Sequence, residues 1–489
     1  MNGAALIPYT YADFVAMLPV WALTLAACAL MLVNMFPQKP NSSVSALVAL
    51  IGLATAGTAA WLHRDLTQSF FRDMFVIDPF STFFTLLFVG IGTVSVLLSW
   101  DYLKRTVLNQ GEFYALMVLA TLGMIFMAAT NDLMMIFLGL ELMSIPLYVL
   151  AGFRKNRFES NEAGLKYFLL GAFASGFLLY GMALIYGTTG TTNLGRIGAF
   201  LTASPILHTP LLAVGALLLF VGFAFKVSLV PFHMWTPDAY EGAPTTATAF
   251  MSAGAKAAGF AGLLRVAMVA LPSVTPDWTQ LLTALAMLTM TVGNVTAILQ
   301  SNLKRMLAYS SIAHAGYVLL GVIAGGAAGA SAVLFYLAVY SVMNLGAFGI
   351  VSLMGRGTDE RVRVQELAGV GFARPWLGAA LAIFMLGLAG IPPTAGFLGK
   401  FYLFRAALAE GHLALVIVAV LNSVIAVYYY LRPVVVMYMT QPDAEALEVS
   451  PALPATLALV ALVGLTFWLG VWPAPLAASA LQSVLAVFP

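Results

Sequence analysis

The sequence predicts an all-α membrane protein with about fourteen transmembrane helices, and three observations support this class. Of its 489 residues, 61% are hydrophobic and only 9% are charged, whereas about a quarter of the residues of a soluble domain are charged. The hydrophobic residues form runs of about 20, the length that crosses a bilayer as a helix. Lys and Arg gather in alternate loops, which is typical of a membrane protein with a fixed orientation.

The expected spans follow one another with short loops, none of which is long enough to form a soluble domain. They cover residues 14–36, 45–62, 79–100, 113–130, 132–152, 163–187, 210–231, 244–271, 277–299, 303–325, 330–355, 375–398, 413–438 and 454–473. The single cysteine, Cys28, excludes a disulfide framework. No Lys or Arg precedes Lys39, so we expect the first run to remain as a span and not to be a cleaved signal peptide.

The distribution of Lys and Arg in the loops predicts the orientation. Loops after odd-numbered spans hold 13 of these residues, whereas loops after even-numbered spans hold four, namely Arg64, Arg72, Arg196 and Arg405. Because cytoplasmic loops carry the excess of positive charge, we expect both termini on the outer side of the membrane.

Two spans are interrupted, and each interruption lies beside a lysine. Pro231 follows Lys226 by five residues in the seventh span, and Pro392-Pro393 precedes Lys400 in the twelfth. Proline removes a backbone donor and clashes with the preceding turn, so we expect spans 7 and 12 to be broken helices. An offset of five spans inverts the second unit, which predicts two inverted five-helix repeats, spans 4–8 and 9–13. Paired interrupted helices in such repeats are typical of a transport site.

This pattern divides the chain into four expected parts. Spans 1–3 occupy residues 1–112, and the first repeat, with spans 4–8, occupies 113–271. The second, inverted repeat with spans 9–13 occupies 272–440, and 441–489 holds span 14.

Few charged residues lie inside the spans, and these are the candidate functional residues. Glu141 is the one acid well inside a span, and the cations are Lys166, Lys226, Lys256, Arg265 and Lys400. A charge at this depth costs several kcal/mol and usually marks an ion or proton path. Lysine can lose its proton, whereas arginine is effectively always protonated, so four lysines favour proton transfer over static pairing.

We expect Glu141 and Lys226 to form a pair, because burial lowers the pKa of a lysine and a nearby carboxylate raises it. Static alternatives remain open: a structural salt bridge for Glu141, bonding to freed carbonyls for Lys256, and snorkelling of Lys166 to the interface. We interpret Arg265 as structural, with its side chain snorkelling from a helix end.

Two histidines are further candidates for the proton relay, because the ordinary pKa of histidine is near 6.5. His314 lies ten residues after Lys304, roughly 15 Å into its helix, a depth that suits a link between the two repeats. His233 lies next to the first interruption. The alternative for both residues is a purely structural histidine whose hydrogen bonds are satisfied within the fold.

Three motifs resemble those of the antiporter-like membrane subunits of respiratory complex I (NADH:quinone oxidoreductase). They are Leu303–His314 (LKRMLAYSSIAH), Pro231–Pro244 (PFHMWTPDAYEGAP) and Gly390–Phe397 (GIPPTAGF), and the resemblance covers nearly the whole chain. Chain length, fourteen spans and a lysine at position 400, where another antiporter-like subunit has a glutamate, indicate the type within this family.

The resemblance implies a proton-translocating subunit of the bacterial inner (plasma) membrane. Its partners would be other membrane-arm subunits, including further antiporter-like subunits and small membrane subunits. Glu141 and Lys226 would form the switching pair of an input half-channel, with Lys166 beside them. Lys256 would be the central relay, and His314 would lead to Lys400, the output residue.

The cofactors of the resembling complex are expected on other subunits. The chain contains no Walker motif and no dinucleotide fingerprint. The resemblance implies that NADH, FMN, iron–sulfur clusters and quinone are used elsewhere in the complex, and we expect no cofactor or metal on this chain.

Other functions share parts of this pattern. A subunit of an Mrp-type cation/proton antiporter or of a membrane-bound hydrogenase would have the same scaffold. A purely structural module would not need lysines at both interruptions, and a transporter of an organic solute would not need an intramembrane polar set that is nearly all titratable.

Overall fold

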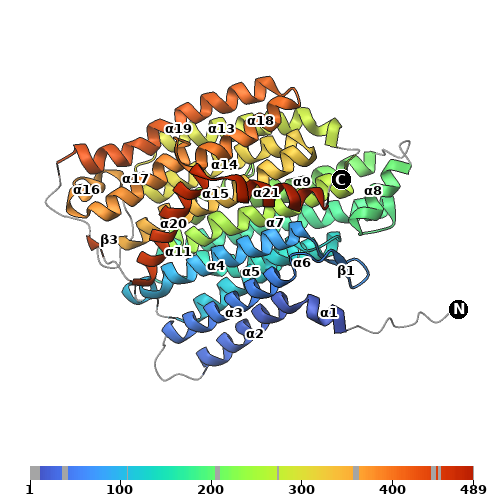
Figure 1. The fold of residues 1–489 in the computed structure, drawn as a ribbon, viewed down its shortest axis with the longest axis horizontal. Helices are drawn as coiled ribbons and strands as arrows, with labels where there is room; N and C mark the ends of the chain where they lie inside the picture. Colours follow the sequence, from blue (N-terminus) through green and yellow to red (C-terminus); the bar gives the residue numbers. More distant parts are fainter. Residues whose placement is uncertain are drawn as a thin grey trace.

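The structure is a computed structural model that describes residues 11–35, 42–106, 108, 110–203, 210–272, 275–355, 363–441, 448–449 and 453–487. It is a bundle in which most long helices run in nearly the same direction (Figure 1). In this described part, twelve helices are long and apolar enough to cross a membrane. The chain is therefore a multi-pass, all-α integral membrane protein, as its composition predicts.

Eleven of the twelve are uninterrupted single helices: α2 (Leu18–Met35), α3 (Ser42–Leu62), α4 (Pro79–Arg105), α6 (Leu133–Ala151), α7 (Phe158–Thr189), α9 (Pro210–Val227), α13 (Thr275–Ile298), α14 (Leu303–Ala324), α15 (Gly326–Leu353), α19 (Leu413–Met439) and α20 (Leu453–Val471). The twelfth is continuous but changes its winding, from α11 (Thr245–Phe250) through the π-helix η2 (Met251–Ala255) and α12 (Lys256–Arg265) to the π-helix η3 (Val266–Ala270).

Shorter elements complete the described part. The helices are α1 (Tyr11–Ala16), α5 (Glu112–Ala128), α8 (Leu194–Ala203), α10 (Trp235–Gly242), α16 (Val370–Ala373), α17 (Pro375–Ala389), α18 (Ala395–Ala409), α21 (Ala474–Leu485) and the 3₁₀ helix η4 (Val364–Leu367). Two antiparallel strand pairs are β1 (Gln68–Phe70) with β2 (Phe75–Ile77) and β3 (Met354–Gly355) with β4 (Glu448–Val449). Figure 1 shows β1 and α8 at one end of the bundle and β3 and α16 at the other.

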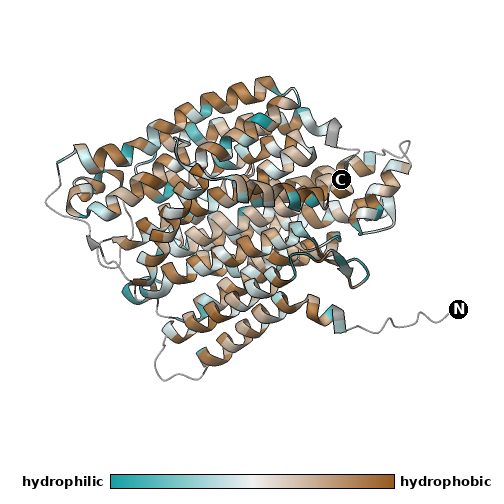
Figure 2. Cartoon of the chain, viewed as in Figure 1, coloured by the Kyte–Doolittle hydropathy of each residue, from teal (hydrophilic) through white to brown (hydrophobic). Residues whose placement is uncertain are grey.

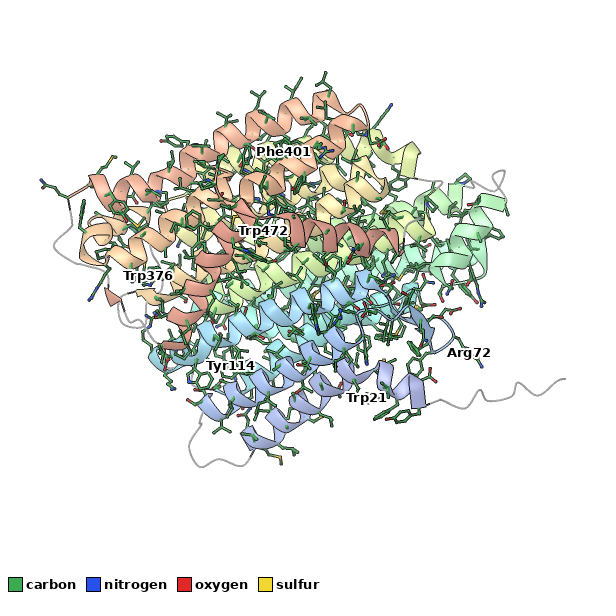
Figure 3. All side chains as sticks on the ribbon, in the orientation of Figure 1. Trp21, Arg72, Tyr114, Trp376, Phe401 and Trp472 are labelled. Atoms are coloured by element: carbon green, nitrogen blue, oxygen red, sulfur yellow. The ribbon has the colours of Figure 1, made fainter. Side chains whose placement is uncertain are left out.

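The expected count of fourteen spans stays a prediction. Twelve expected spans match the long helices, whereas α5, with 17 residues, and α17, with 15, are shorter than a typical span. Two elements do not follow from the hydrophobic pattern: the β1–β2 hairpin, whose Arg72 projects from the bundle in Figure 3, and the C-terminal helix α21. Both lie in segments that lack a long hydrophobic run.

The most enclosed helices are α14 and α15, and they form the centre of the bundle. Nearly all their side chains are buried, whereas only about a third of the span residues of α2, α7, α19 and α20 are. The exposed side chains of these outer helices are largely Leu, Val and Phe, and hydrophobic colours dominate the bundle in Figure 2. A helix that is apolar on its outer face and also contacts the bundle is suited to a lipid or protein environment.

Helices α9 and α17 end in the same backbone motif. After α9, Ser228 adopts the left-handed conformation (φ 66°), and the amide of Leu229 bonds to the carbonyl of Ala224 at 2.8 Å. After α17, Gly390 is left-handed (φ 86°), and the amide of Ile391 bonds to the carbonyl of Leu386 at 3.0 Å. Both are Schellman endings, in which a left-handed residue turns the chain away from the helix axis.

Each ending is followed by a second short helix. The chain resumes as α10 at Trp235 after the first ending and as α18 at Ala395 after the second. Lys226 lies just before the first ending, whereas Lys400 lies in the helix that follows the second. Lys226 therefore precedes its helix ending in the chain, whereas Lys400 follows its own.

The expected snorkelling of Arg265 is wrong, because this side chain is buried in the bundle. Its exposure is 1%, and its Nη2 donates to both carboxylate oxygens of Asp78 at 2.9 and 2.8 Å. Asp78 also caps the start of α4. The pair joins the N-terminal helices to the helix that carries Lys256, so its role in the structure is still a structural one.

Candidate functional site

Three lysines are buried in the interior without a carboxylate partner within 4 Å in the described part of the chain. Lys226, Lys256 and Lys400 are 2%, 3% and 5% exposed, and each donates its hydrogen bonds to neutral oxygens. Burying a charge without an opposite charge beside it is costly. These three residues form the framework of the candidate site.

Lys226 is held by residues of α6 and α7. Its Nζ donates to the hydroxyl of Ser144 at 2.7 Å and lies 3.4 Å from the hydroxyl of Tyr167. Nζ also lies 5.5 Å from the ring centre of Tyr167 and 5.9 Å from that of Tyr148. A hydroxyl and two aromatic faces therefore surround the ammonium.

The expected direct pair between Glu141 and Lys226 is not formed in the structure. Glu141 is only half-buried and accepts a hydrogen bond from Ser175 of α7, while Lys226 bonds to Ser144, three residues further along α6. Ser175 and Lys226 line one small pocket between α6, α7 and α9. The carboxylate and the ammonium are thus neighbours, each with a serine hydroxyl as its partner.

Lys256 begins α12, directly after the π-helical turn η2, and donates to the carbonyl of Ser311 in α14 at 2.5 Å. Its helix also contacts Lys226. A side chain at Gly259 would come within 3.5 Å of Cγ of Lys226 and 2.8 Å of Cγ1 of Val227. The close approach that glycine allows here places the two lysine-bearing helices in direct contact.

His314 lies between Lys256 and Lys400 and has a hydroxyl partner on each ring nitrogen. Nδ1 bonds to Tyr336, and Nε2 lies 2.8 Å from the hydroxyl of Tyr430. The ring is 3% exposed. Because neutral imidazole has one donor and one acceptor nitrogen, this arrangement fits a neutral ring with two tyrosine partners.

Polar and aromatic side chains lie between Lys256, His314 and Lys400. Next to the carbonyl that accepts from Lys256, the hydroxyl of Ser311 accepts from Tyr340 at 2.8 Å, and the ring of Tyr340 lies 5.0 Å from that of His314. The ring of Tyr317 lies 5.8 Å from that of His314 and 4.9 Å from Nζ of Lys400. The described side chains thus form an almost continuous polar and aromatic line from Lys256 to Lys400.

Lys400 of α18 bonds to the end of α17, where its Nζ donates to the carbonyl of Ala389 at 2.9 Å. Ala389 is the last residue of α17. The ammonium therefore satisfies one of the carbonyls that the end of a helix leaves free. Sequence reasoning offered this type of bond as an alternative for Lys256, but the structure places it at Lys400.

Lys166 does not join Glu141 as the resemblance implies. Its side chain is 43% exposed, and Nζ lies 2.7 Å from carboxylate oxygens of both Glu162 and Asp238. Asp238 also pairs with Arg305 at 2.7 Å. Lys166 therefore belongs to an ion-pair network that joins α7, α10 and α14.

His233 is the candidate with the least connection to the others. It lies in the turn between α9 and α10 and is half-buried, and its Nδ1 has no hydrogen-bond partner within the described chain. The structure brings it to none of the buried lysines by a hydrogen bond.

Sequence reasoning missed the neutral partners of these groups, chiefly Ser144, Tyr167, Ser311 and Tyr430. Each lies in a hydrophobic run in which a hydroxyl is unremarkable. Their helical spacing to the named candidates was a usable signal: Ser144 follows Glu141 by three residues, and Ser311 precedes His314 by three. Among the described residues, no three His, Cys, Asp or Glu side chains gather closely enough to hold a metal ion.

The fold and the interior lysines define the antiporter-like class of membrane proteins. A family profile described as "NADH:quinone oxidoreductase/Mrp antiporter, TM" matches residues 130–426, which include every candidate residue. The Mrp complex from Dietzia sp. DQ12-45-1b contains a chain of the same fold, with a TM-score of 0.82 at 22% identity, covering 98% of each chain.

Relatives with higher identity specify the family. NADH-quinone oxidoreductase subunit N of Trichlorobacter lovleyi is 50% identical over 467 residues, which is 96% of each chain. A chain of respiratory complex I from Thermus thermophilus is 36% identical, with a TM-score of 0.80, over 94% of this chain and 98% of that one. The chain belongs to the family of NADH-quinone oxidoreductase subunit N.

Proposed function

We propose that this chain translocates protons in the membrane arm of NADH:quinone oxidoreductase, through a relay of Glu141, Lys226, Lys256, His314 and Lys400. The observation that carries the proposal is the burial of three lysines whose hydrogen bonds all go to neutral oxygens. A position that only stabilised the fold would hold either a neutral residue or a lysine paired with a carboxylate. A lysine that can lose its proton avoids this cost and can pass the proton on.

The order of transfer follows from the contacts. Lys226 packs beside the helix of Lys256, and Lys256 binds the segment of α14 that leads to His314. Tyr317 lies between His314 and Lys400. Protons would therefore pass from the first broken helix to the second through the centre of the bundle. Lys166 and His233 would act at the edge of this relay, Lys166 through its ion pair with α10.

The separated state of Glu141 and Lys226 suggests how the relay is switched. When the carboxylate approaches the ammonium, the charged form of the amine is favoured, and when it withdraws to Ser175 the proton is released toward Lys256. A tenfold change in a protonation equilibrium is about 1.4 kcal/mol, and moving one charge across 100 mV costs about 2.3 kcal/mol. A change of the protonation equilibrium of Lys226 by a few factors of ten is therefore enough to move a proton against the membrane potential.

The assembled enzyme would supply the remaining parts. We place the chain in the bacterial inner membrane with both termini on the outer side, beside further antiporter-like and small membrane subunits. The inverted repeats at 113–271 and 272–440 would each provide half of the path. NADH, FMN, iron–sulfur clusters and quinone would act in other subunits, and quinone reduction would drive the movement of Glu141 and Lys226.

The test uses the assembled complex in inverted membrane vesicles. Glu141→Ala and Lys226→Ala should lower NADH-driven proton pumping about tenfold or more at an unchanged amount of complex. Lys155→Ala and Glu410→Ala, which remove charges from exposed positions, are the matched controls and should pump normally. Full pumping by both interior variants would refute the roles proposed for this pair.

A further inference from the structure

We propose that Tyr148, Tyr167 and Trp235 form an aromatic clamp that positions the ammonium of Lys226. This inference rests on the proposed role of Lys226 in proton transfer. None of the three aromatic residues belongs to the relay itself. Two of them contact the ammonium through their ring faces, and the third fixes the position of one of these rings.

The first part of the clamp is the pair of tyrosines around Nζ of Lys226. Its distances to the ring centres of Tyr167 and Tyr148 are 5.5 and 5.9 Å, within the range of cation–π attraction. The two rings are nearly perpendicular, at 87°, with centres 4.7 Å apart. Both side chains are buried, at 0% and 8% exposure. The negative ring faces thus favour the protonated amine where no carboxylate contacts it.

The second part is Trp235, the first residue of α10. Its ring stacks on Tyr167 with centres 4.2 Å apart and planes inclined by only 2°. Its indole N–H donates to the carbonyl of Phe225 at 3.0 Å, one residue before Lys226. Trp235 is 2% exposed and therefore joins the end of α9, the start of α10 and the Tyr167 ring in one buried unit. It is a positioning residue, because it acts on Lys226 through these neighbours.

The two breaks share one hydrogen-bond pattern, in which the indole of Trp235 takes part at the first. In both breaks, a side chain of the second helix donates to a carbonyl at the end of the first. The donor is Trp235 to Phe225 in the first break and Lys400 to Ala389 in the second. The carbonyl of Phe225 also accepts from the amide of Ser228 at 3.1 Å, and the ammonium of Lys226 binds Ser144 and the two tyrosine rings and no carbonyl at this break.

The clamp also connects Lys226 to the ion pairs of α10. Lys166, the neighbour of Tyr167 in α7, pairs with Asp238, which lies three residues after Trp235. Helix α7 therefore contacts α10 at two adjacent residues: Lys166 forms the ion pair with Asp238, and Tyr167 stacks on Trp235. A displacement of α10 would shift Trp235 against Tyr167 and change the surroundings of the ammonium. The geometry thus provides a path by which ion-pair rearrangement around Asp238 reaches Lys226.

The test compares aromatic with aliphatic replacements in the assembled complex. Tyr167→Leu removes the ring face at the ammonium, and Trp235→Leu removes the stack. Tyr167→Phe keeps the ring and loses only the hydroxyl. The matched controls are Tyr186→Leu, on the exposed side of the same helix at 53% exposure, and Trp376→Leu, at 41% exposure. Native gels report the amount of intact complex, and pumping in inverted vesicles is measured as a function of pH.

The clamp predicts a shift of the pH profile that a purely structural role would not produce. Loss of one aromatic face changes the protonation equilibrium by about fivefold, so the alkaline limb of pumping should move to lower pH by roughly 0.7 unit in both leucine variants. Both controls should retain the wild-type limb. Tyr167→Phe keeps the ring face and loses only the hydroxyl 3.4 Å from Nζ, so its limb should move less than that of Tyr167→Leu. Tyr167→Met, which fills the space without an aromatic face, replaces Tyr167→Leu if the leucine variant does not assemble.

The outcomes separate this inference from the function on which it rests. If Lys226→Ala abolishes pumping while the leucine or methionine variants keep the wild-type pH profile, the clamp is refuted and the relay stands. If Lys226→Ala pumps normally, the proposed function itself is refuted. A shifted alkaline limb in the variants that lack the ring or its stack, together with loss of pumping in Lys226→Ala, supports both.

Discussion

Removing Arg265 should destabilise the chain strongly, because it leaves a buried carboxylate without its cation. The guanidinium makes two hydrogen bonds to Asp78 and one, at 2.6 Å from Nε, to the carbonyl of Ala128. The two charged side chains are 2% and 3% exposed, so water cannot replace the missing partner. Arg265→Gln keeps a polar side chain of smaller length but removes the charge that Asp78 requires.

The size of the effect follows from this burial. Breaking a buried ion pair by removing one partner costs about 3–5 kcal/mol. An unfolding entropy of about 2.1 cal/mol/K per residue gives roughly 1 kcal/mol/K for a chain of 489 residues. The unfolding midpoint should therefore fall by roughly 3–5 °C. The double variant Asp78→Asn with Arg265→Gln removes both charges and should recover most of this loss.

The assay heats the detergent-solubilised complex and measures the chain that remains intact by size-exclusion chromatography. Arg405→Gln, at an exposed position, is the matched control and should leave the midpoint unchanged. A midpoint of Arg265→Gln within about 1 °C of the wild type would refute the reasoning, since the ion pair would then contribute little. Equal losses in the single and double variants would show that the lost packing, and not the unpaired charge, determines the cost.

Two further predictions concern the surroundings of His314 and Lys400. Tyr430→Phe removes the hydroxyl that lies 2.8 Å from Nε2 of His314, and leaving a buried nitrogen unpaired costs about 1–3 kcal/mol. Pumping per complex should therefore fall, whereas Tyr428→Phe, at an exposed site, should not change it. Gly390→Ala places a Cβ 3.0 Å from Cδ of Lys400 at a residue with φ 86°, so the midpoint of thermal unfolding should drop. An unchanged midpoint would show that the break can accommodate a side chain.

The fold class could be predicted because it depends on strong local signals. Runs of apolar residues specify helices wherever they are long enough to cross the membrane. The prolines near Lys226 and Lys400 indicated where α9 and α17 end. The number of spans is harder to predict than their positions. Helices α5 and α17 lie where spans are expected, but they are shorter than a typical span.

The contacts could not be predicted, because they join residues that are far apart in the sequence. Asp78 stands at the end of a loop, where an acid is ordinary, and its pairing with Arg265 appears only when α4 packs on α12. The left-handed ending of α9 falls on Ser228, a residue that carries no signal for it, whereas Gly390 is the expected type. The partners of Lys226 are a serine and tyrosines, and neither type stands out in an apolar run.

The measurement that tests the relay most directly is the number of protons pumped per NADH in Lys256→Arg. Arginine keeps a cation that can bond to the carbonyl of Ser311, but it cannot release its proton at physiological pH. The account predicts that Lys256→Arg loses pumping by about tenfold or more, as Lys256→Ala does, in a complex that assembles normally. Lys155→Arg should pump as the wild type does. Wild-type proton stoichiometry in Lys256→Arg would contradict the account, because a fixed charge would then suffice at the centre of the relay.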